Sequence, residues 1–464
     1  MQRPNIVFVF ADQLRYQSCG YAGDPHQVTP NLDRLAKESV NFHQAVSVFP
    51  VCTPYRASLF TGKYPSSTGV FNNGFHCMAD SDAIGHVLTD AGYETAYIGK
   101  WHLWKKGSRT FIPPGPYRLG FDGHWQAYNW NHSYKNGFYY EDTPEAHTMS
   151  GYQTDAQTDL VLDYLKDAPQ DKPFALFASF EVPHPPNTWD ECPDEWIDKF
   201  KDLDIPEPPN RHNPNHVEGV PKMDEDWYSE NWYSREEERR RVYYLMTAVM
   251  DHNVGRISDS LEELGMSENT IFVFTSDHGE MLYAHNRMQK RIFYEESIRV
   301  PFLMRWPQKF PLGMKTDVCL NTPDIMPMLL DLADVPIPES VEGVSPVSQL
   351  ETSNEGNIAF MQGMSESNFF EGEEWRAVRD VQYIYVRMRT DNRELLFDHQ
   401  NDPYELVDLS KDPEQESRLA HYRQILDARM HNLNDRFEST SWYTENWTVD
   451  DRIVRSETRD LEQE

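Results

Sequence analysis

The hydrophobic positions of this chain fall into short uninterrupted runs that are separated by stretches of helical periodicity. Uninterrupted apolar runs of strand length are typical of parallel strands buried on both faces. Their alternation with helical patterns predicts an α/β fold in which helices cover both faces of a large, mostly parallel sheet. The predicted parallel strands are Ile6–Ala11, Thr95–Ile98, Phe174–Phe180, Ile271–Thr275 and Pro301–Met304.

Polar side chains capable of chemistry follow four of these runs. Ligands of such sheets bind beyond the carboxyl ends of the strands, so we expect these side chains to share one site. Ordinary loops would instead show a mixture of Gly, Asn and Ser. The residues, in strand order, are Asp12, then Lys100 and His102, then His184, and finally Asp277 and His278.

The pattern changes after about residue 355. Residues 1–355 are predicted to form the main α/β domain, and residues 356–464 a smaller α+β subdomain. Short runs at Ala377-Val378, Tyr383–Val386 and Leu395–Phe397 predict a small antiparallel sheet in that subdomain. Residues 414–437 have a helical pattern, and we expect poor order in the acidic end from about Thr448.

One long stretch of the main domain, residues 185–233, is rich in Pro, Trp and acidic residues and lacks clean periodicity. It is predicted to be an irregular excursion that faces the substrate, since loops of this length are usually functional. Ser234 and Glu237 match a capping box. A long helix is predicted to follow towards Gly265, with Tyr243, Met246 and Met250 on its apolar face.

Composition narrows the possible functions. The 464 residues carry a formal net charge of -32, so neither nucleic acid nor an anionic membrane is an expected partner. The five cysteines are odd in number and contain no CxxC pair, which argues against a disulfide framework or a structural zinc site. No signal peptide or membrane span is apparent. We therefore expect a cytoplasmic protein, or a periplasmic or secreted one if a leader has been removed.

The segment around Cys52 carries the clearest chemical signal. Thr53 is suited to cap a helix and Pro54 to its first turn, which would place Cys52 just before the helix N-terminus. Free backbone N–H groups and the helix dipole favour an anion there. Arg56, four residues later, can reach the same side. This arrangement suits nucleophilic attack on a sulfate or phosphate group.

Cys52-Thr53-Pro54-Tyr55-Arg56, followed by Leu59-Phe60-Thr61-Gly62, resembles the signature of the type I sulfatases, which belong to the alkaline phosphatase-like superfamily. In that family a maturation enzyme oxidises the cysteine to formylglycine, whose hydrated aldehyde supplies the nucleophile. Tyr55 departs from the small residue usual at its position. Further family landmarks are Pro4–Gln13, Thr29–Asp33, Gly99–Leu103, Ser276–Glu280, Phe293–Ser297, Leu396–Asp398 and Asn401–Glu405.

The resemblance implies a metal site. Asp12, Asp277 and His278 match the family's metal positions, with the modified residue 52 as a further ligand. Oxygen-rich ligands favour Ca²⁺ or Mg²⁺, with Ca²⁺ expected here, and the imidazole leaves room for Mn²⁺. Gln13 stands where many relatives have a second Asp, and its side-chain oxygen is predicted to be a ligand.

The resemblance also implies catalytic roles. Arg56 and Lys100 are expected to stabilise the aldehyde hydrate and the sulfate, and His102 to act as the base that releases sulfate. His184 and Lys290 are expected at the leaving oxygen. Arg287 and Arg291 lie close to Lys290 in the sequence and are the alternatives for the cation at the leaving oxygen.

The predicted activity is hydrolysis of a sulfate ester, first of all on a short sulfated oligosaccharide, with sugar rings stacking on Trp189, Trp227 and Trp232. One alternative is a phosphonate monoester hydrolase or phosphodiesterase of the same superfamily, in which the Lys-x-His pair is replaced. Another is an inactive binder of sulfated glycans. Weaker candidates for substrate contact are Asn73, His76, Trp104, Lys105, Lys106 and Arg109.

Overall fold

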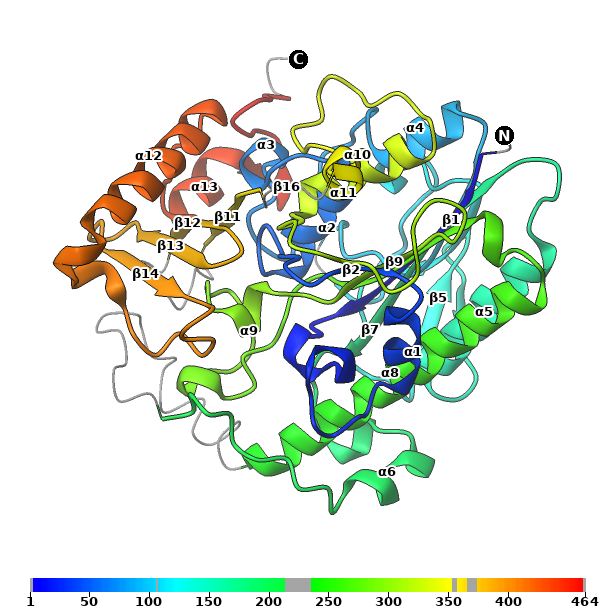
Figure 1. Cartoon of the computed structure of the whole chain (residues 1–464). Helices are drawn as coiled ribbons and strands as arrows, with labels where there is room; N and C mark the ends of the chain where they lie inside the picture. The colour runs from blue at the N-terminus through cyan, green and yellow to red at the C-terminus, as the bar shows by residue number, and fades with distance from the viewer. Residues whose placement is uncertain (1–2, 106, 213–234, 353–356, 365–373, 462–464) are drawn as a thin grey trace.

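The computed structural model describes residues 3–105, 107–212, 235–352, 357–364 and 374–461 (Figure 1). Its centre is a ten-stranded sheet. The order across this sheet is β10 (Lys315–Thr316), β2 (Val40–Phe42), β9 (Phe302–Arg305), β8 (Thr270–Ser276), β1 (Asn5–Asp12), β7 (Phe174–Pro183), β3 (Glu94–Lys100), β4 (His124–Tyr128), β5 (Phe138–Tyr140) and β6 (Ala146–Thr148). The five strands from β8 to β4 run parallel, which confirms the predicted α/β fold.

The fifth predicted strand runs in the other direction. β9 pairs antiparallel with β8, so the expectation of a parallel strand at Pro301–Met304 was wrong. After β8 the chain does not cross back to the amino end of the sheet through a helix. It stays at the carboxyl edge, forms the short helix α9 (Glu295–Ile298) and enters β9 from that edge.

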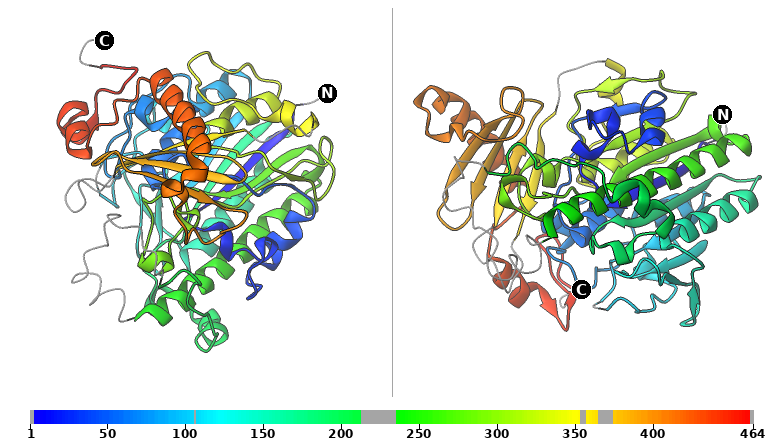
Figure 2. Two further views of the ribbon diagram at one scale, coloured as in Figure 1. Left: turned by 60° about the vertical axis from the view of Figure 1, so that its left-hand side comes forward. Right: turned by 90° about the horizontal axis from the view of Figure 1, so that it is seen from below.

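Helices cover both faces of the sheet (Figures 1 and 2). The faces are separated by the alternation within β1, where Ile6, Phe8 and Phe10 belong to one apolar core and the intervening residues to another. The first core lies under α2 (Cys52–Thr61), α3 (Pro65–Thr68), α4 (Ile84–Asp90), α10 (Thr322–Leu332) and α11 (Val347–Thr352). The second lies under α1 (Pro30–Ala36), α5 (Gln153–Asp167), α6 (Asp194–Phe200) and α8 (Glu236–Glu263).

The long predicted helix is α8, and Tyr243, Met246 and Met250 are fully buried on its apolar face. Ser234, the first residue of the expected capping box, lies outside the described residues; the helix begins at Glu236. The described part of the stretch 185–233 contains α6 and is therefore not irregular throughout. Trp189 packs partly buried against the second core, while Trp227 and Trp232 lie outside the described residues.

A separate four-stranded antiparallel sheet follows in the C-terminal part of the chain. Its strands are β11 (Ala359–Gly363), β12 (Trp375–Arg379), β13 (Tyr383–Met388) and β14 (Glu394–Asp398). One face packs on Phe293 and Tyr294 of the main body, and the other packs under α12 (Glu416–Asn432). This confirms the predicted small sheet with its helix.

The acidic end is ordered as far as the structure describes it. After α13 (Thr440–Trp447), the short strands β15 (Thr448–Val449) and β16 (Arg452–Ile453) form a hairpin. Arg452 forms a bridge with His76, and Ile453 is buried, so the expectation of poor order was wrong for this part. Among the described helices, none combines the length and apolar character needed to cross a membrane.

Candidate active site

Four parallel strands bring the predicted site residues to one edge of the sheet. Asp12 ends β1 and Lys100 ends β3. His184 directly follows β7, and Asp277 directly follows β8. Gly99 allows the close packing of β3 on β7, because it has φ 110° and a Cβ there would lie 2.3 Å from the Ser179 carbonyl oxygen. The shared strand edge predicted from the sequence is therefore present.

Helix α2 carries Cys52 and Arg56 to the same place. The helix begins at Cys52 itself, with Val51 as its N-cap, so the prediction that Thr53 caps the helix was wrong. A residue distant in the chain takes the part of the cap: the Thr53 N–H, in the first turn, donates to Asn73 Oδ1 at 3.0 Å. One turn later, Arg56 is fully buried.

Cys52 lies at the centre of the polar cluster. Its Sγ is 3.3 Å from His278 Nε2, 3.3 Å from Lys290 Nζ and 3.6 Å from Asp12 Oδ1. Burial, and then Asp12, raise the pKa of the Cys52 thiol. The unmodified sulfur therefore stays protonated at neutral pH and is a weak nucleophile.

A metal ion would fit beside this sulfur. Ligand atoms of Asp12, Cys52, Asp277 and His278 all lie within 4.8 Å of one another, and all four residues are buried. His278 Nδ1 lies 3.0 Å from the Gly279 carbonyl oxygen, which can only accept, so Nδ1 carries the proton. Nε2 then presents its lone pair to the cluster, as a metal ligand must.

The pKa values of the two carboxyl groups in this cluster shift in opposite directions. Burial and then the neighbouring Asp12 raise the pKa of Asp277. Burial would also raise the pKa of Asp12, but Lys100 and the other surrounding cations hold it well below its usual value. Two buried carboxylates at such close range are compatible with full ionisation when a divalent cation lies between them.

Gln13 adjoins the cluster. Its backbone N–H donates to Asp277 Oδ1 at 3.0 Å, and its side-chain N–H donates to Glu280. The side-chain Oε1 accepts from Lys290 Nζ at 2.6 Å. The amide is thus oriented with its oxygen towards Lys290, and ligation of a metal by Gln13 remains a prediction.

Three buried cations surround the cluster. Arg56 Nη2 lies 3.4 Å from both Asp12 Oδ2 and Asp277 Oδ2. Lys100 Nζ lies 2.6 Å from Asp12 Oδ2, and Lys290 Nζ contacts Cys52 as described above. Such fixed positive charges favour an anionic group and stabilise negative charge that develops on it.

Glu181 also lies in the site, although no role is predicted for it from the sequence. Its carboxylate is 3.3 Å from Lys100 Nζ and accepts from the backbone N–H of Asn131 at 2.9 Å. The available signal was its position in β7, three residues before His184, which directly follows that strand. Glu280, which orients Gln13, was part of a family landmark but was also given no role.

His102 and His184 lie outside this inner group of contacts. Burial and then Lys100 lower the pKa of His102 well below its ordinary value, so its ring is neutral. Burial and then Lys290 do the same for His184. His184 Nδ1 is 2.6 Å from the Pro185 carbonyl oxygen, which leaves Nε2 unprotonated. Both rings are therefore in the form that accepts a proton.

Comparison with known proteins decides the family. A profile described as Sulfatase matches residues 4–335. The chain belongs to the sulfatase family. A second profile, described as the C-terminal part of N-sulphoglucosamine sulphohydrolase, matches residues 284–440. This sulfatase is thus a sulfuric ester hydrolase, as the resemblance of the Cys52 segment implied.

Relatives of this sulfatase match it over most of its length. An ulvan-active sulfatase of Formosa agariphila is 37% identical over 453 residues, which cover 95% of this chain and 84% of that protein. An N-acetylglucosamine-6-O-sulfatase of Bacteroides thetaiotaomicron is 27% identical over 90% of this chain and 83% of its own length. The structure of a candidate sulfatase from Bacteroides fragilis superposes with a TM-score of 0.80, at 29% identity, over 95% of this chain and 97% of that one.

The weaker candidates of the sequence analysis have structural contacts in this sulfatase. Asn73 holds the start of α2, and the ring of His76 packs 3.9 Å from that of Trp104. Lys105 lies over Trp104, and Arg109 over Phe138. Lys106 lies outside the described residues.

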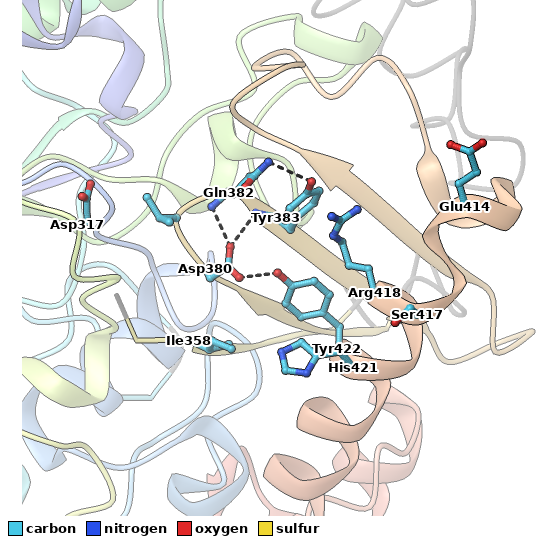
Figure 3. Close-up of a pocket in the computed structure, with 11 residues that line it drawn as sticks. Asp317, Ile358, Asp380, Gln382, Tyr383, Glu414, Ser417, Arg418, His421 and Tyr422 are labelled. Carbon is cyan, nitrogen blue, oxygen red and sulfur yellow. Dashed lines mark hydrogen bonds between the residues drawn. The ribbon is translucent and has the colours of Figure 1, made fainter. Parts of the chain in front are cut away.

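A hollow of about 840 Å³ lies elsewhere on the sulfatase, between α12 and the four-stranded sheet (Figure 3). Its lining includes none of the predicted site residues. Asp380 at its centre is already engaged, since it accepts from the N–H groups of Gln382 and Tyr383 and from the Tyr422 hydroxyl. The strand-edge cluster therefore stays the candidate active site of the enzyme.

Proposed function

We propose that this sulfatase hydrolyses a sulfate ester on a carbohydrate, using formylglycine formed from Cys52 by a maturation enzyme together with a divalent metal. The observation that carries the proposal is the position of Cys52, which touches the candidate metal ligands and Lys290 at the buried start of a helix. The carbohydrate assignment is supported by the names of two relatives, which refer to ulvan and to N-acetylglucosamine.

Formylglycine supplies chemistry that a thiol or a serine lacks. Its hydrated aldehyde has two hydroxyl groups, one to attack sulfur and a second whose deprotonation expels sulfate and restores the aldehyde. Asp12, Asp277, His278 and residue 52 would hold the metal, which would supply Lewis-acid polarisation of the sulfate oxygens and would lower the pKa of the attacking hydroxyl. Gln13 is proposed as a further ligand through its side-chain oxygen.

The remaining residues hold the sulfate and move protons. Arg56 and Lys100 are fixed beside Asp12 and stabilise the negative charge of the transferring sulfate. His102, which is neutral, accepts the proton of the second hydroxyl. His184 and Lys290 lie at the leaving oxygen, where the Lys290 ammonium donates a proton to the alkoxide as it departs, so that the product leaves as the alcohol.

The activity test uses protein that has been co-expressed with a formylglycine-generating enzyme. We expect sulfate release from ulvan oligosaccharides or N-acetylglucosamine 6-sulfate, and none from the Cys52→Ala variant. An aryl phosphonate monoester is included in the panel. Cleavage of the phosphonate without any sulfate release would contradict the proposal in favour of the phosphonate hydrolase alternative. If mass spectrometry shows that Cys52 has been converted to the aldehyde and the protein is still inactive on every substrate, the result would favour a glycan binder.

The metal test measures thermal stability as well as activity. Calcium added to chelator-treated protein is expected to raise Tm, because a ligand at about one hundred times its Kd stabilises the native state by about 2.7 kcal/mol. The His278→Ala variant is expected to lose most of this shift. A larger rise with Mn²⁺ or Mg²⁺ than with Ca²⁺ would contradict the choice of calcium, and no rise with any of the three would contradict the metal site.

A further inference from the structure

The segment after β4, residues 129–134, lies against the catalytic cluster, although no predicted site residue belongs to it. The His102 N–H donates to the Asn129 carbonyl oxygen at 2.9 Å. Two residues later the Asn131 N–H donates to Glu181, the carboxylate that also lies beside Lys100. The Asn131 side chain donates to Gln153 Oε1 at 2.6 Å. The segment is therefore held firmly by groups that also position the site.

His132 projects from this segment onto His184. The two imidazole rings are nearly parallel, with centroids 4.7 Å apart and an interplanar angle of 24°. His132 Nε2 lies 3.8 Å from Glu181 Oε1, and the ring of Trp130 lies 4.7 Å from that of His132. The side chain of His132 is 44% exposed, whereas that of Glu181 is fully buried. Three rings thus lead from the surface to the catalytic cluster.

His184 is itself held in place by hydrogen bonds, so the rings of His132 and Trp130 have a fixed position relative to it. Its Nδ1 is engaged by the Pro185 carbonyl oxygen, and its own carbonyl oxygen accepts from the Tyr134 hydroxyl at 2.5 Å. Under the proposed function, His184 lies at the leaving oxygen of the ester. Any group bonded to that oxygen must then extend past His184, next to the exposed ring of His132.

We propose that His132, with Trp130 beside it, contacts the sugar that bears the sulfate and determines specificity for that sugar. An imidazole edge exchanges hydrogen bonds with sugar hydroxyls, and an aromatic ring packs on the apolar C–H face of a sugar. This inference rests on the proposed function, since it places the leaving alcohol beside His184. It assigns His132 to the alcohol part of the substrate and not to the sulfate.

The test compares two substrates that share the sulfate and differ in the alcohol. One is whichever of the two saccharide substrates, ulvan oligosaccharide or N-acetylglucosamine 6-sulfate, the wild type cleaves faster. The other is 4-nitrophenyl sulfate, whose ring has no hydroxyl groups. We expect His132→Ala to lower kcat/KM on the saccharide at least about tenfold, mainly through KM, and to change kcat/KM on the aryl sulfate less than about threefold. His132→Phe, which can keep the ring stack but has no nitrogen, is expected to resemble His132→Ala.

His147 offers a matched control. Its side chain is 40% exposed, its ring stacks 5.0 Å from Tyr139, and its Nε2 lies 3.9 Å from Glu141 Oε2. His147→Ala should leave kcat/KM unchanged on both substrates. An equal loss on both substrates in His132→Ala would overturn the proposal, because it would show that His132 acts only by supporting His184. No loss on either substrate would overturn it too.

The proposed function and the role of His132 fail in different measurements. The wild type alone decides whether a sulfated carbohydrate is cleaved. The ratio of variant to wild-type kcat/KM on the two substrates decides whether His132 contacts the sugar. A wild type that cleaves only the aryl sulfate would overturn both, since no sugar would then occupy the site.

Discussion

At the scale of single residues, the site is a balance of buried charges. Lys100 is fully buried between Asp12 Oδ2 at 2.6 Å and Glu181 Oε1 at 3.3 Å. Burial would lower the pKa of this ammonium, but the two carboxylates more than compensate and raise it. Lys100 is therefore a permanent positive charge, and its removal would take one cationic partner from each of two buried carboxylates.

Replacement of Lys100 by Ala is expected to lower kcat about 10²- to 10³-fold, since a fixed positive charge that stabilises the transition state is lost. The measurement is sulfate release by protein whose Cys52 conversion has been matched to that of the wild type. Lys166→Ala is the control of equal charge, because Lys166 pairs with Asp163 on the exposed surface of α5. Equal activity of the two variants would contradict a catalytic role for Lys100.

Tyr55 is the residue at which the segment departs from the family signature. It is 1% exposed and belongs to the apolar core under α2, where its ring fills space. Tyr55→Ser is expected to destabilise the fold by about 3–5 kcal/mol, as large-to-small core changes do.

The same variant is expected to raise the fraction of Cys52 that the maturation enzyme converts, because it restores a small residue within the signature. Mass spectrometry of the peptide containing residue 52 gives this fraction, and thermal melting gives the stability. Tyr64→Ser, at a buried tyrosine outside the signature, is the control for destabilisation alone. If both variants change conversion equally, Tyr55 does not influence maturation.

At the scale of elements, the start of α2 is held by a neighbour in space. The helix has no side-chain cap of its own at Val51, and Asn73 supplies the acceptor for the Thr53 N–H. Asn73→Ala is expected to cost about 1 kcal/mol, the usual value of a lost helix cap. A few-fold loss of kcat should accompany it, because Cys52 lies in the first turn. Asn73→Asp keeps an acceptor and should retain both stability and activity.

The same contrast explains which elements and residues could be predicted from the sequence. β1, β3, β7 and β8 each contain an apolar run, and Asp12, Lys100 and Asp277 lie at or directly after the ends of β1, β3 and β8, as predicted. β4 was missed because polar residues alternate within it. Asn73 and His132 act through residues distant in the chain, and a single sequence carries no signal of such proximity.

At the scale of the whole molecule, a buried charge network joins the small sheet to the main domain. Arg379 of β12 binds Glu295 of α9 through two hydrogen bonds, of 2.7 and 2.9 Å. Glu405, just beyond β14, accepts from the Glu295 N–H at 2.9 Å. Burial would raise the pKa of Glu295, but Arg379 holds it well below its ordinary value. Burial and then Glu295 raise the pKa of Glu405.

These opposite shifts predict opposite effects of pH on stability. Glu295 contributes stability above its unfolded pKa of about 4.5 and loses it as the pH falls towards its lower folded pKa. Glu295→Gln should therefore lower Tm strongly at pH 7, where about 3–5 kcal/mol is typical of breaking a buried ion pair. The difference in Tm between this variant and the wild type should become smaller below about pH 4.5.

Glu405 is expected to behave in the other direction. Because its folded pKa is raised, its contribution is complete below about pH 4.5 and is lost as the pH rises through the folded value. Glu405→Gln mimics the protonated carboxyl, so its Tm relative to wild type should be more favourable at pH 8 than at pH 5, at constant calcium. Glu414→Gln, at an exposed carboxylate, is the control and should show no such difference. A Glu405→Gln difference that is constant with pH would mean that Glu405 is ionised in the folded protein throughout this range. Arg379 would then neutralise Glu405 as well as Glu295, and the two carboxylates would share one cation between the small sheet and the main domain.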